Sequence, residues 1–426
     1  MLAGGLLVYD YVRVREVFPP LTFISTVDVS ELEPSEAADK LRSVSLSELY
    51  GSVITFETST ANYSFSPEAI GISLDYEQTV KNAFALTHNK GYLKELKGRL
   101  KNQAALCPLV LKADDQLAKG LLSCLADELR FTARDATIVL FEETGGYHIE
   151  AEDLGKELDL PKTIASLQAL LAKGEKVFPL ILDLTEPRVT EKILRANPPA
   201  HRLAAYTTYY GSHDSPNRIS NIKLVASWLD NRLLMPGDIV SVADALGEIT
   251  PERGFKEAFV IVQGQLVPLL GGGSCQIATT LYNAVQLADL KIIQRRNHSM
   301  YFNIYPLGRD AGVYPGQLDF KFENSSGYPV LIKSLATNRR LSFRIYGTPS
   351  GKTVKFSPPL VFILTSSGYK PSTVRTVLAA DSPFKTIVKR TVYDSSGQLL
   401  TEEAISSSYK LYGEKSNVPI ARPEPR

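Results

Sequence analysis

An internal repeat constrains the first half of this 426-residue chain more than any other feature. Shifting the sequence by 84 residues aligns segment 63–75 with segment 147–159 without a gap, and the Tyr, Glu, Gly, Leu and Asp positions are identical. The match continues to Thr79 against Thr163 and reaches back to the apolar segments 54–56 and 138–140. A period of this size predicts two copies of one small module.

Each copy has the pattern of a helix, two strands, a short turn and a second helix. Apolar spacing predicts the helices at 35–41 and 117–129 in front and at 76–85 and 161–171 behind. This order predicts two α+β modules, each with its own sheet. Asp75 and Asp159 directly precede a predicted helix and are expected to cap it. Neither copy has His, Cys or acidic residues clustered at the spacing of metal ligands. We therefore expect the modules to bind a partner or to act as spacers, and not to catalyse a reaction.

The composition is that of a folded globular chain, and it lacks the excess of basic residues expected of a nucleic-acid-binding protein. The 47 basic and 46 acidic residues nearly cancel, and the 44% hydrophobic content is that of a globular protein. The length predicts about three domains. The apolar segment 1–9 is shorter than the roughly 20 residues of a membrane span. It is either the remnant of a longer anchor or signal segment, or an ordinary buried strand.

A different unit is expected after a proline-containing boundary at 187–206. Ser215 can cap a helix whose first residue is Pro216. The alternating segment 258–269 predicts a hairpin around Gln263-Gly264, and it leads to a glycine triplet. Further strands are predicted at 291–298, 319–322, 328–332, 386–393 and 398–404.

The glycine triplet 271–273 precedes Ser274 and then Cys275, which begins a predicted helix. Glycine permits a sharp turn and close backbone approach. Unpaired N–H groups and the helix dipole in the first turn stabilise a thiolate, so a cysteine there is predisposed to be a nucleophile. The alternative is a small hydrophobic residue packed under the turn. The other cysteines, Cys107 and Cys124, could pair in an oxidising compartment or each be buried apolar residues.

Cys275, His298 and Asp310 follow one another in the order nucleophile, base and orienting carboxylate. This is the logic of papain-like and transglutaminase-like thiol enzymes, in which the histidine takes the thiol proton and a third group fixes its tautomer. Asn297 or Asp319 could take the place of Asp310.

Two other kinds of site fit the sequence less well. The glycine triplet lacks the Gly-Lys-Ser/Thr ending of a phosphate-binding loop. A zinc site from Cys275 and His298, with His213 or Asp214, matches no standard spacing.

The second half carries motifs that resemble the VanW family, named from vancomycin-resistance gene clusters. The resemblance covers about 206–346 and departs from the usual family pattern at His213-Asp214 and at Ser274. The two repeats in front resemble the peptidoglycan-binding modules that often precede VanW regions. The motifs are Ser215-Pro216-Asn217-Arg218, Pro236-Gly237, Glu252-Arg253-Gly254-Phe255, Gly271-Gly272-Gly273-Ser274-Cys275-Gln276, Thr280-Leu281-Tyr282-Asn283-Ala284, Asn297-His298-Ser299, Pro306-Leu307-Gly308-Arg309-Asp310 and Tyr328-Pro329.

The resemblance implies an extracytoplasmic, membrane-anchored protein at a bacterial cell surface, with peptidoglycan or another wall polymer as partner. The expected fold is multidomain α+β, with a VanW domain that has a papain- or transglutaminase-like core. The expected divisions are an N-terminal stub at 1–20, peptidoglycan-binding repeats at 21–105 and 106–195, the VanW domain at 200–347 and a β-rich segment at 348–426.

The expected function is a Cys-His-Asp amide hydrolase or a transpeptidase-like acyl transferase acting on peptidoglycan peptides. The alternative is a non-catalytic cell-wall-binding scaffold or accessory protein. Gly272, Gly273, Gln276 and Arg309 are expected to bind substrate. No cofactor and no metal are expected, and the oligomeric state stays open.

Overall fold

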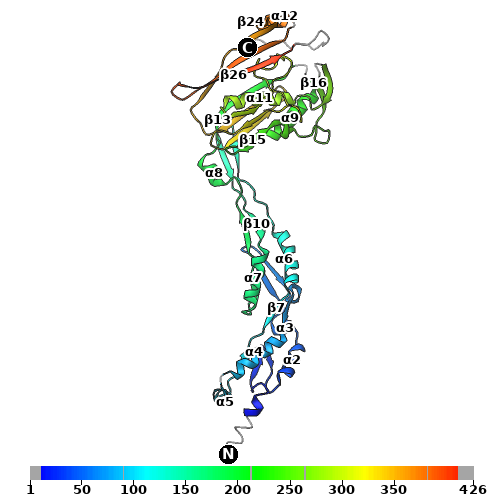
Figure 1. The fold of residues 1–426 in the computed structure, drawn as a ribbon, viewed down its shortest axis with the longest axis vertical. Helices are drawn as coiled ribbons and strands as arrows, with labels where there is room; N and C mark the ends of the chain where they lie inside the picture. The colour runs from blue at the N-terminus through cyan, green and yellow to red at the C-terminus, as the bar shows by residue number, and fades with distance from the viewer. Residues whose placement is uncertain (1–10, 90, 212–213, 263–264, 381, 411–426) are drawn as a thin grey trace, which may run out of the picture. The chain divides into compact units, whose positions relative to one another are not determined.

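The two copies of the repeat fold alike in a computed structural model, which describes residues 11–89, 91–211, 214–262, 265–380 and 382–410 (Figure 1). Each copy contains a two-stranded hairpin of the same register. Ile54 faces Phe65 across the first hairpin, and Ile138 faces Ile149, 84 residues later, across the second. The hairpins are β3 (Ile54–Glu57) with β4 (Asn62–Phe65), and β8 (Thr137–Phe141) with β9 (Gly146–Glu150).

The second helix of each copy begins in the same way. Asp75 and Asp159 each accept a hydrogen bond from the backbone N–H three residues later, which confirms both predicted caps. One turn on, the buried Thr79 and Thr163 hydroxyls each accept a backbone N–H from the segment alongside. These helices are α4 (Tyr76–His88) and α7 (Leu160–Leu171).

The copies do not have a sheet each, contrary to expectation. Strand β11 (Val177–Pro179) of the second copy pairs in parallel with β3 of the first, and β5 (Ile72–Leu74) pairs with β7 (Leu111–Ala113). Ile54 and Phe56 share one core with helices of the second copy. A lone hairpin is at best marginally stable in water, so packing on the next copy gives it a core.

The chain divides into two compact units whose boundary does not follow the sequence order. Unit 1 is Met1–Arg134 with Asp153–Pro187, and unit 2 is Asp135–Glu152 with Arg188–Arg426. The hairpin of the second copy therefore belongs to unit 2. There Ile138 and Ile149 pack in one cluster with Leu331 and Tyr346.

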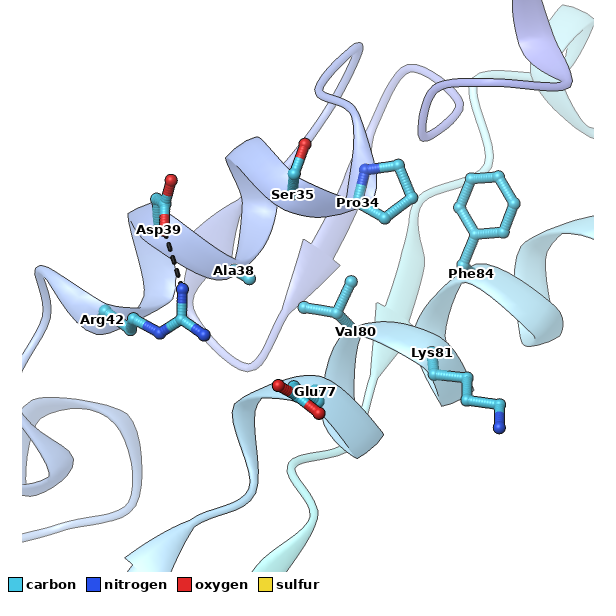
Figure 2. Close-up of a pocket in the computed structure, with 9 residues that line it drawn as sticks. All are labelled: Pro34, Ser35, Ala38, Asp39, Arg42, Glu77, Val80, Lys81 and Phe84. Atoms are coloured by element: carbon cyan, nitrogen blue, oxygen red, sulfur yellow. Dashed lines mark hydrogen bonds and ion pairs between the residues drawn. The ribbon is translucent and has the colours of Figure 1, made fainter.

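Unit 1 also contains a shallow groove of about 530 Å³ between α2 (Pro34–Arg42) and α4. Figure 2 shows the apolar Ala38, Val80 and Phe84 along it, with Asp39 and Arg42 paired at 2.8 Å. Cys107 is buried, Cys124 is exposed, and both are free thiols. The other elements are β1 (Thr22–Ile24), β2 (Val27–Asp28), α3 (Leu46–Leu49), η1 (Glu68–Ile70), α5 (Tyr92–Leu100), β6 (Ala105–Cys107), α6 (Asp115–Leu129), β10 (Gly155–Leu158) and β12 (Leu182–Thr185).

Unit 2 packs two helices against a four-stranded sheet of order β13-β21-β20-β14. Helix α9 begins at Pro216 behind the predicted Ser215 cap. A smaller sheet has the order β15-β19-β18. The elements before the glycine triplet are α8 (Glu191–Ala196), β13 (His201–Tyr209), α9 (Pro216–Leu229), β14 (Arg232–Leu234), β15 (Ile239–Ser241), α10 (Val242–Leu246), β16 (Glu257–Val262) and β17 (Gln265–Leu270).

The predicted hairpins are confirmed as β16 with β17 and as β25 with β26, although Gln263-Gly264 lies outside the described residues. The C-terminal strands form a separate five-stranded sheet. The elements from the glycine triplet onward are α11 (Ser274–Leu287), β18 (Lys291–Gln294), β19 (Lys321–Glu323), β20 (Val330–Ala336), β21 (Arg340–Gly347), β22 (Thr353–Phe356), β23 (Leu360–Thr365), β24 (Gly368–Ser372), α12 (Val374–Ala379), β25 (Phe384–Tyr393) and β26 (Leu399–Tyr409).

In the described part of the chain, no helix is both long enough and apolar enough to cross a membrane. The apolar segment 1–9, where an anchor remnant is expected, lies outside the described residues.

Candidate active site

Cys275 is the second residue of α11, and the glycines before it allow the helix to start in a crowded place. Gly271 and Gly273 have positive φ values of 83° and 111°. A Cβ on Gly272 would lie 2.8 Å from both the Ala258 Cβ and the Phe259 carbonyl oxygen of β16. The triplet is therefore required for close packing.

Helix α11 is buried on nearly all sides, and its polar residues hold the segment that carries Asp310. Thr279 Oγ1 donates to the Ala311 carbonyl and accepts the Ala311 N–H, both at 3.0 Å. Asn283 Nδ2 donates to the Arg309 carbonyl at 2.8 Å. Because buried polar groups need partners, these contacts fix one helix and one loop to each other. The same helix thus carries Cys275 and positions Asp310.

His298 lies in a loop beyond β18. The predicted strand 291–298 ends at Gln294, so the histidine is not on a strand as expected. Its Nδ1 is 2.6 Å from Asp310 Oδ2, and its backbone N–H donates to the same oxygen at 2.7 Å. The Cys275 side chain acts on the pKa of the imidazole, and the imidazole acts on the pKa of the thiol, so the two groups are neighbours. The three residues therefore meet in one site, with Asp310 hydrogen-bonded to His298.

Asp310 is 3% exposed and has further partners on its second oxygen. The Tyr409 hydroxyl donates to Oδ1 at 2.5 Å, and the Arg295 guanidinium lies 3.4 Å from it. Although burial acts to raise the pKa of Asp310, hydrogen bonding and charge attraction from His298 outweigh it and lower that pKa. The carboxylate is therefore held ionised beside the imidazole.

Cys275 and His298 stabilise each other's charged forms. Burial acts to raise the pKa of Cys275, but the interactions with His298, Val313 and Arg218 together outweigh it, and the net direction is downward from 9.0. Burial acts to lower the pKa of His298, but Cys275 and Asp310 together raise it from 6.5 to about 10. A thiolate and an imidazolium are therefore the favoured pair at neutral pH, as in a thiol nucleophile.

Aromatic rings enclose the imidazole while the cysteine stays half-buried. Tyr305 stacks on His298 at a centroid distance of 5.2 Å and an interplanar angle of 18°, and Phe302 meets it edge-on. Cys275 Sγ lies 3.5 Å from the Val313 carbonyl oxygen. The rings limit the positions that the imidazole can take.

The residues expected to bind substrate are largely turned toward the protein. Gln276 is 1% exposed and bonded through its side chain to Arg218 and Thr208. The Arg309 guanidinium lies 4.3 Å above the Phe356 ring, and Gly272 and Gly273 pack against β16 and α9. A substrate-binding role for these four residues stays a prediction.

The alternative partners for His298 have other contacts. Asn297 donates to the carbonyls of His298 and Ser408. Asp319 accepts from the Ser241 hydroxyl and from a backbone N–H of α10. Of the three candidates, Asp310 is the one bonded to the imidazole. His213, the alternative metal ligand, lies outside the described residues.

Tyr409, Arg295 and Arg218 contact residues of the site, although the sequence predicts no role for them. Tyr409 comes from β26, 99 residues after Asp310, and its hydroxyl also accepts the Gly308 N–H. The expected β-rich segment 348–426 therefore contributes to the site. Arg295 comes directly after β18, three residues before His298, and its charge beside a candidate triad is the one signal that the sequence offers. Arg218 was noted only as part of a motif.

Comparison with known proteins identifies the class. Residues 217–346 match the family described as "VanW like protein", and residues 63–179 match the one described as "Putative peptidoglycan binding domain". These matches place a VanW-like region behind a region that matches a peptidoglycan-binding family. The second match spans the expected boundary between the two repeats.

Two curated relatives are similar to part of the chain. It is 36% identical over 162 residues to "Uncharacterized protein YoaR" of Bacillus subtilis (strain 168), which is 38% of this chain and 53% of the relative. It is 29% identical over 115 residues to "Vancomycin B-type resistance protein VanW" of Enterococcus faecalis (strain ATCC 700802 / V583), which is 26% of this chain and 42% of the relative. The chain thus spans about half the length of these relatives. No solved structure matches it significantly.

Proposed function

We propose that unit 2 is a thiol-dependent acyl transferase or amide hydrolase that acts on peptides of the bacterial cell wall. The observation that carries this proposal is the meeting of Cys275, His298 and the buried Asp310 in one site, with Asp310 hydrogen-bonded to the imidazole. A nucleophile, a base and an orienting carboxylate in contact are the three parts that thiol catalysis of acyl transfer needs.

The residues suggest a two-step reaction. The Cys275 thiolate attacks the carbonyl carbon of an amide and forms a thioester. The amine leaves with the proton that the His298 imidazolium donates. His298 then takes a proton from water or from an incoming amine, which attacks the thioester and regenerates the thiol. Water gives hydrolysis and an amine gives transfer.

The cell wall is proposed as the place of action because of the domain in front. Residues 63–179 match a peptidoglycan-binding family, and one relative of the VanW region is named for resistance to vancomycin, a cell-wall antibiotic. In this proposal the first half holds wall polymer and the second half acts on its peptides outside the cytoplasm.

The direct test uses the full chain and wall-derived peptides, with products identified by mass spectrometry. Cys275→Ala is expected to lower turnover by at least about three orders of magnitude, since the nucleophile is removed. Cys124→Ala, a change at an exposed cysteine, is the matched control and should keep activity. Turnover by Cys275→Ala equal to that of the parent chain would contradict the proposal.

The rival function is a non-catalytic wall-binding scaffold. The contacts of Tyr305 and Phe302 with His298 favour it, because rings that cover the imidazole restrict its access to a substrate. Thiol alkylation at neutral pH separates the two functions. Rapid modification of native Cys275, slowed in His298→Ala, supports the enzyme, whereas resistance until denaturation supports the scaffold.

A further inference from the structure

An arginine from α9 contacts the residues on both sides of Cys275. Arg218 Nη2 donates to Gln276 Oε1 at 2.7 Å. A Cβ on Gly273 would lie 3.2 Å from the Arg218 Cγ, so the side chain passes over the start of α11. Gln276 is itself held by the Thr208 hydroxyl at 2.9 Å. The guanidinium is thus fixed next to the proposed nucleophile.

Two buried donors at this place make no hydrogen bond. Within the described residues, Arg218 Nη1 and the Tyr210 hydroxyl are buried and have no hydrogen-bond partner. Arg218 Nη1 forms an ion pair with Asp214 Oδ2 at 3.1 Å but no hydrogen bond, and that oxygen already accepts the Gly211 N–H at 2.7 Å. A buried donor without a hydrogen bond is costly and calls for an explanation.

Both donors belong to one electrostatic environment and stay protonated. Tyr210 follows Tyr209, whose carbonyl accepts from Gln276 Nε2 at 3.3 Å. The charges of Arg218 and Asp214 both act on the Tyr210 hydroxyl. Burial raises the pKa of Tyr210 to about 12, which keeps it a hydrogen-bond donor at neutral pH. The charge of Arg218 also acts on Cys275. Donors that make no hydrogen bond, in the electrostatic environment of a nucleophile, fit a ligand that only accepts hydrogen bonds.

We propose that Arg218 and Tyr210 bind a carboxylate that the substrate carries next to the acyl group attacked by Cys275. This inference rests on the proposed thiol chemistry and adds the substrate class. A carboxylate only accepts hydrogen bonds, and guanidinium is its preferred partner. A carboxamide in the same place would direct its own N–H donors toward these donors, and no hydrogen bond could form between them. The site would therefore select peptides with a free acid over their amides.

Two alkylating reagents test this without a substrate. Iodoacetate and iodoacetamide alkylate thiols in the same way. They differ mainly in the group next to the reacting carbon, which is a carboxylate in iodoacetate and an amide in iodoacetamide. Their rate ratio at Cys275, measured by peptide mapping, is compared with that at the exposed Cys124 in the same sample. We expect the Cys275 ratio to favour iodoacetate at least tenfold over the Cys124 ratio. Arg218→Gln should lower the Cys275 ratio well below that of the parent chain, and the preference that remains is the share that His298 contributes.

Matched variants separate charge binding from damage. Lys223→Gln removes the same charge from an exposed side chain of the same helix and should keep the preference. Tyr210→Phe removes only an unpartnered hydroxyl and should reduce the preference without unfolding. Thermal unfolding checks each variant. His298 is unchanged in all of them, so its own attraction for iodoacetate cancels.

The outcomes distinguish this inference from the proposed function. Equal ratios at Cys275 and Cys124 in the parent chain, or a Cys275 ratio that Arg218→Gln leaves unchanged from the parent, would overturn the inference and leave the thiol chemistry standing. A native Cys275 that reacts with neither reagent would overturn both.

Peptides then identify the source of the carboxylate. Acyl-dipeptides with a free C-terminus, or with an amidated C-terminus and an acidic side chain, are tested for protection of Cys275 from iodoacetamide. Protection by either acid, but not by the fully amidated peptide, supports the inference, and lack of protection by both acids contradicts it.

Discussion

Cys275 and His298 influence each other's titration, so the reactivity of one reports on the other. His298 lowers the pKa of the thiol from 9.0 against the opposing effect of burial. In His298→Ala the burial acts unopposed by that charge, so we expect the pKa read from alkylation rates to rise. Once that pKa lies above 7, each further unit lowers the thiolate fraction at pH 7 about tenfold. The measurement is the rate of iodoacetamide labelling of Cys275 from pH 5 to pH 10.

The sign of this effect follows from which form the fold favours. The thiolate, favoured by a depressed pKa, persists as pH falls below 9.0 and is lost only below its own lowered value. The imidazolium, favoured by a raised pKa, is lost as pH rises through about 10. The reactive pair therefore occupies the window between them. Identical profiles in the parent chain and in His298→Ala would show that the two groups do not interact.

At the scale of elements, the close approach of the glycine triplet to β16 places Cys275. Gly272→Ala puts a methyl group 2.8 Å from both the Ala258 Cβ and a backbone oxygen, so a strand or the helix start must move. We expect the free energy of unfolding of unit 2 to fall by about 1–3 kcal/mol, and labelling of Cys275 to slow. Chemical denaturation and alkylation measure the two effects.

The control for this change is a glycine with open space around it. Gly120 lies inside α6, and nothing stands within 4 Å of a Cβ there. Gly120→Ala should stabilise unit 1 by about 0.5–1 kcal/mol through helix propensity. If both alanines leave stability and labelling unchanged, the triplet has no packing role.

Elements that depend on nearby residues could be predicted from the sequence, and pairings between distant segments could not. The caps at Asp75 and Asp159 and the helix behind Cys275 follow from local patterns. The order of Cys275, His298 and Asp310 along the chain predicts that they lie together, because thiol catalysis requires the nucleophile, the base and the orienting group to be close to one another. Nothing local couples Tyr409 to Asp310, because the hydrogen bond joins a β-rich segment to a loop 99 residues earlier.

At the scale of the whole molecule, equivalent residues of the two repeats stabilise different units. Ile54 lies in a core of unit 1, whereas Ile138, 84 residues later, lies in a cluster of unit 2 with Leu331 and Tyr346. We expect Ile54→Ala to destabilise unit 1 and Ile138→Ala to destabilise unit 2, each by about 2–4 kcal/mol. Hydrogen exchange, followed separately in peptides of each unit, measures the difference.

Each variant serves as the control for the other, since the substitution and the repeat position are the same. Loss of protection in unit 1 from both variants would contradict the assignment of hairpin 135–152 to unit 2.

Each repeat contributes its hairpin to the core of the part of the chain that follows it. This arrangement limits where recombination can add or remove a repeat. The first hairpin completes a core of the second repeat, and the second completes a cluster of unit 2. Recombination that adds or removes a whole 84-residue period keeps one hairpin for every receiving core. A recombination breakpoint between a hairpin and the core on which it packs leaves an apolar hairpin without its packing partner. It also exposes the surface that the hairpin covered. Exchange of this VanW domain between genes is therefore expected to carry residues 135–152 with it.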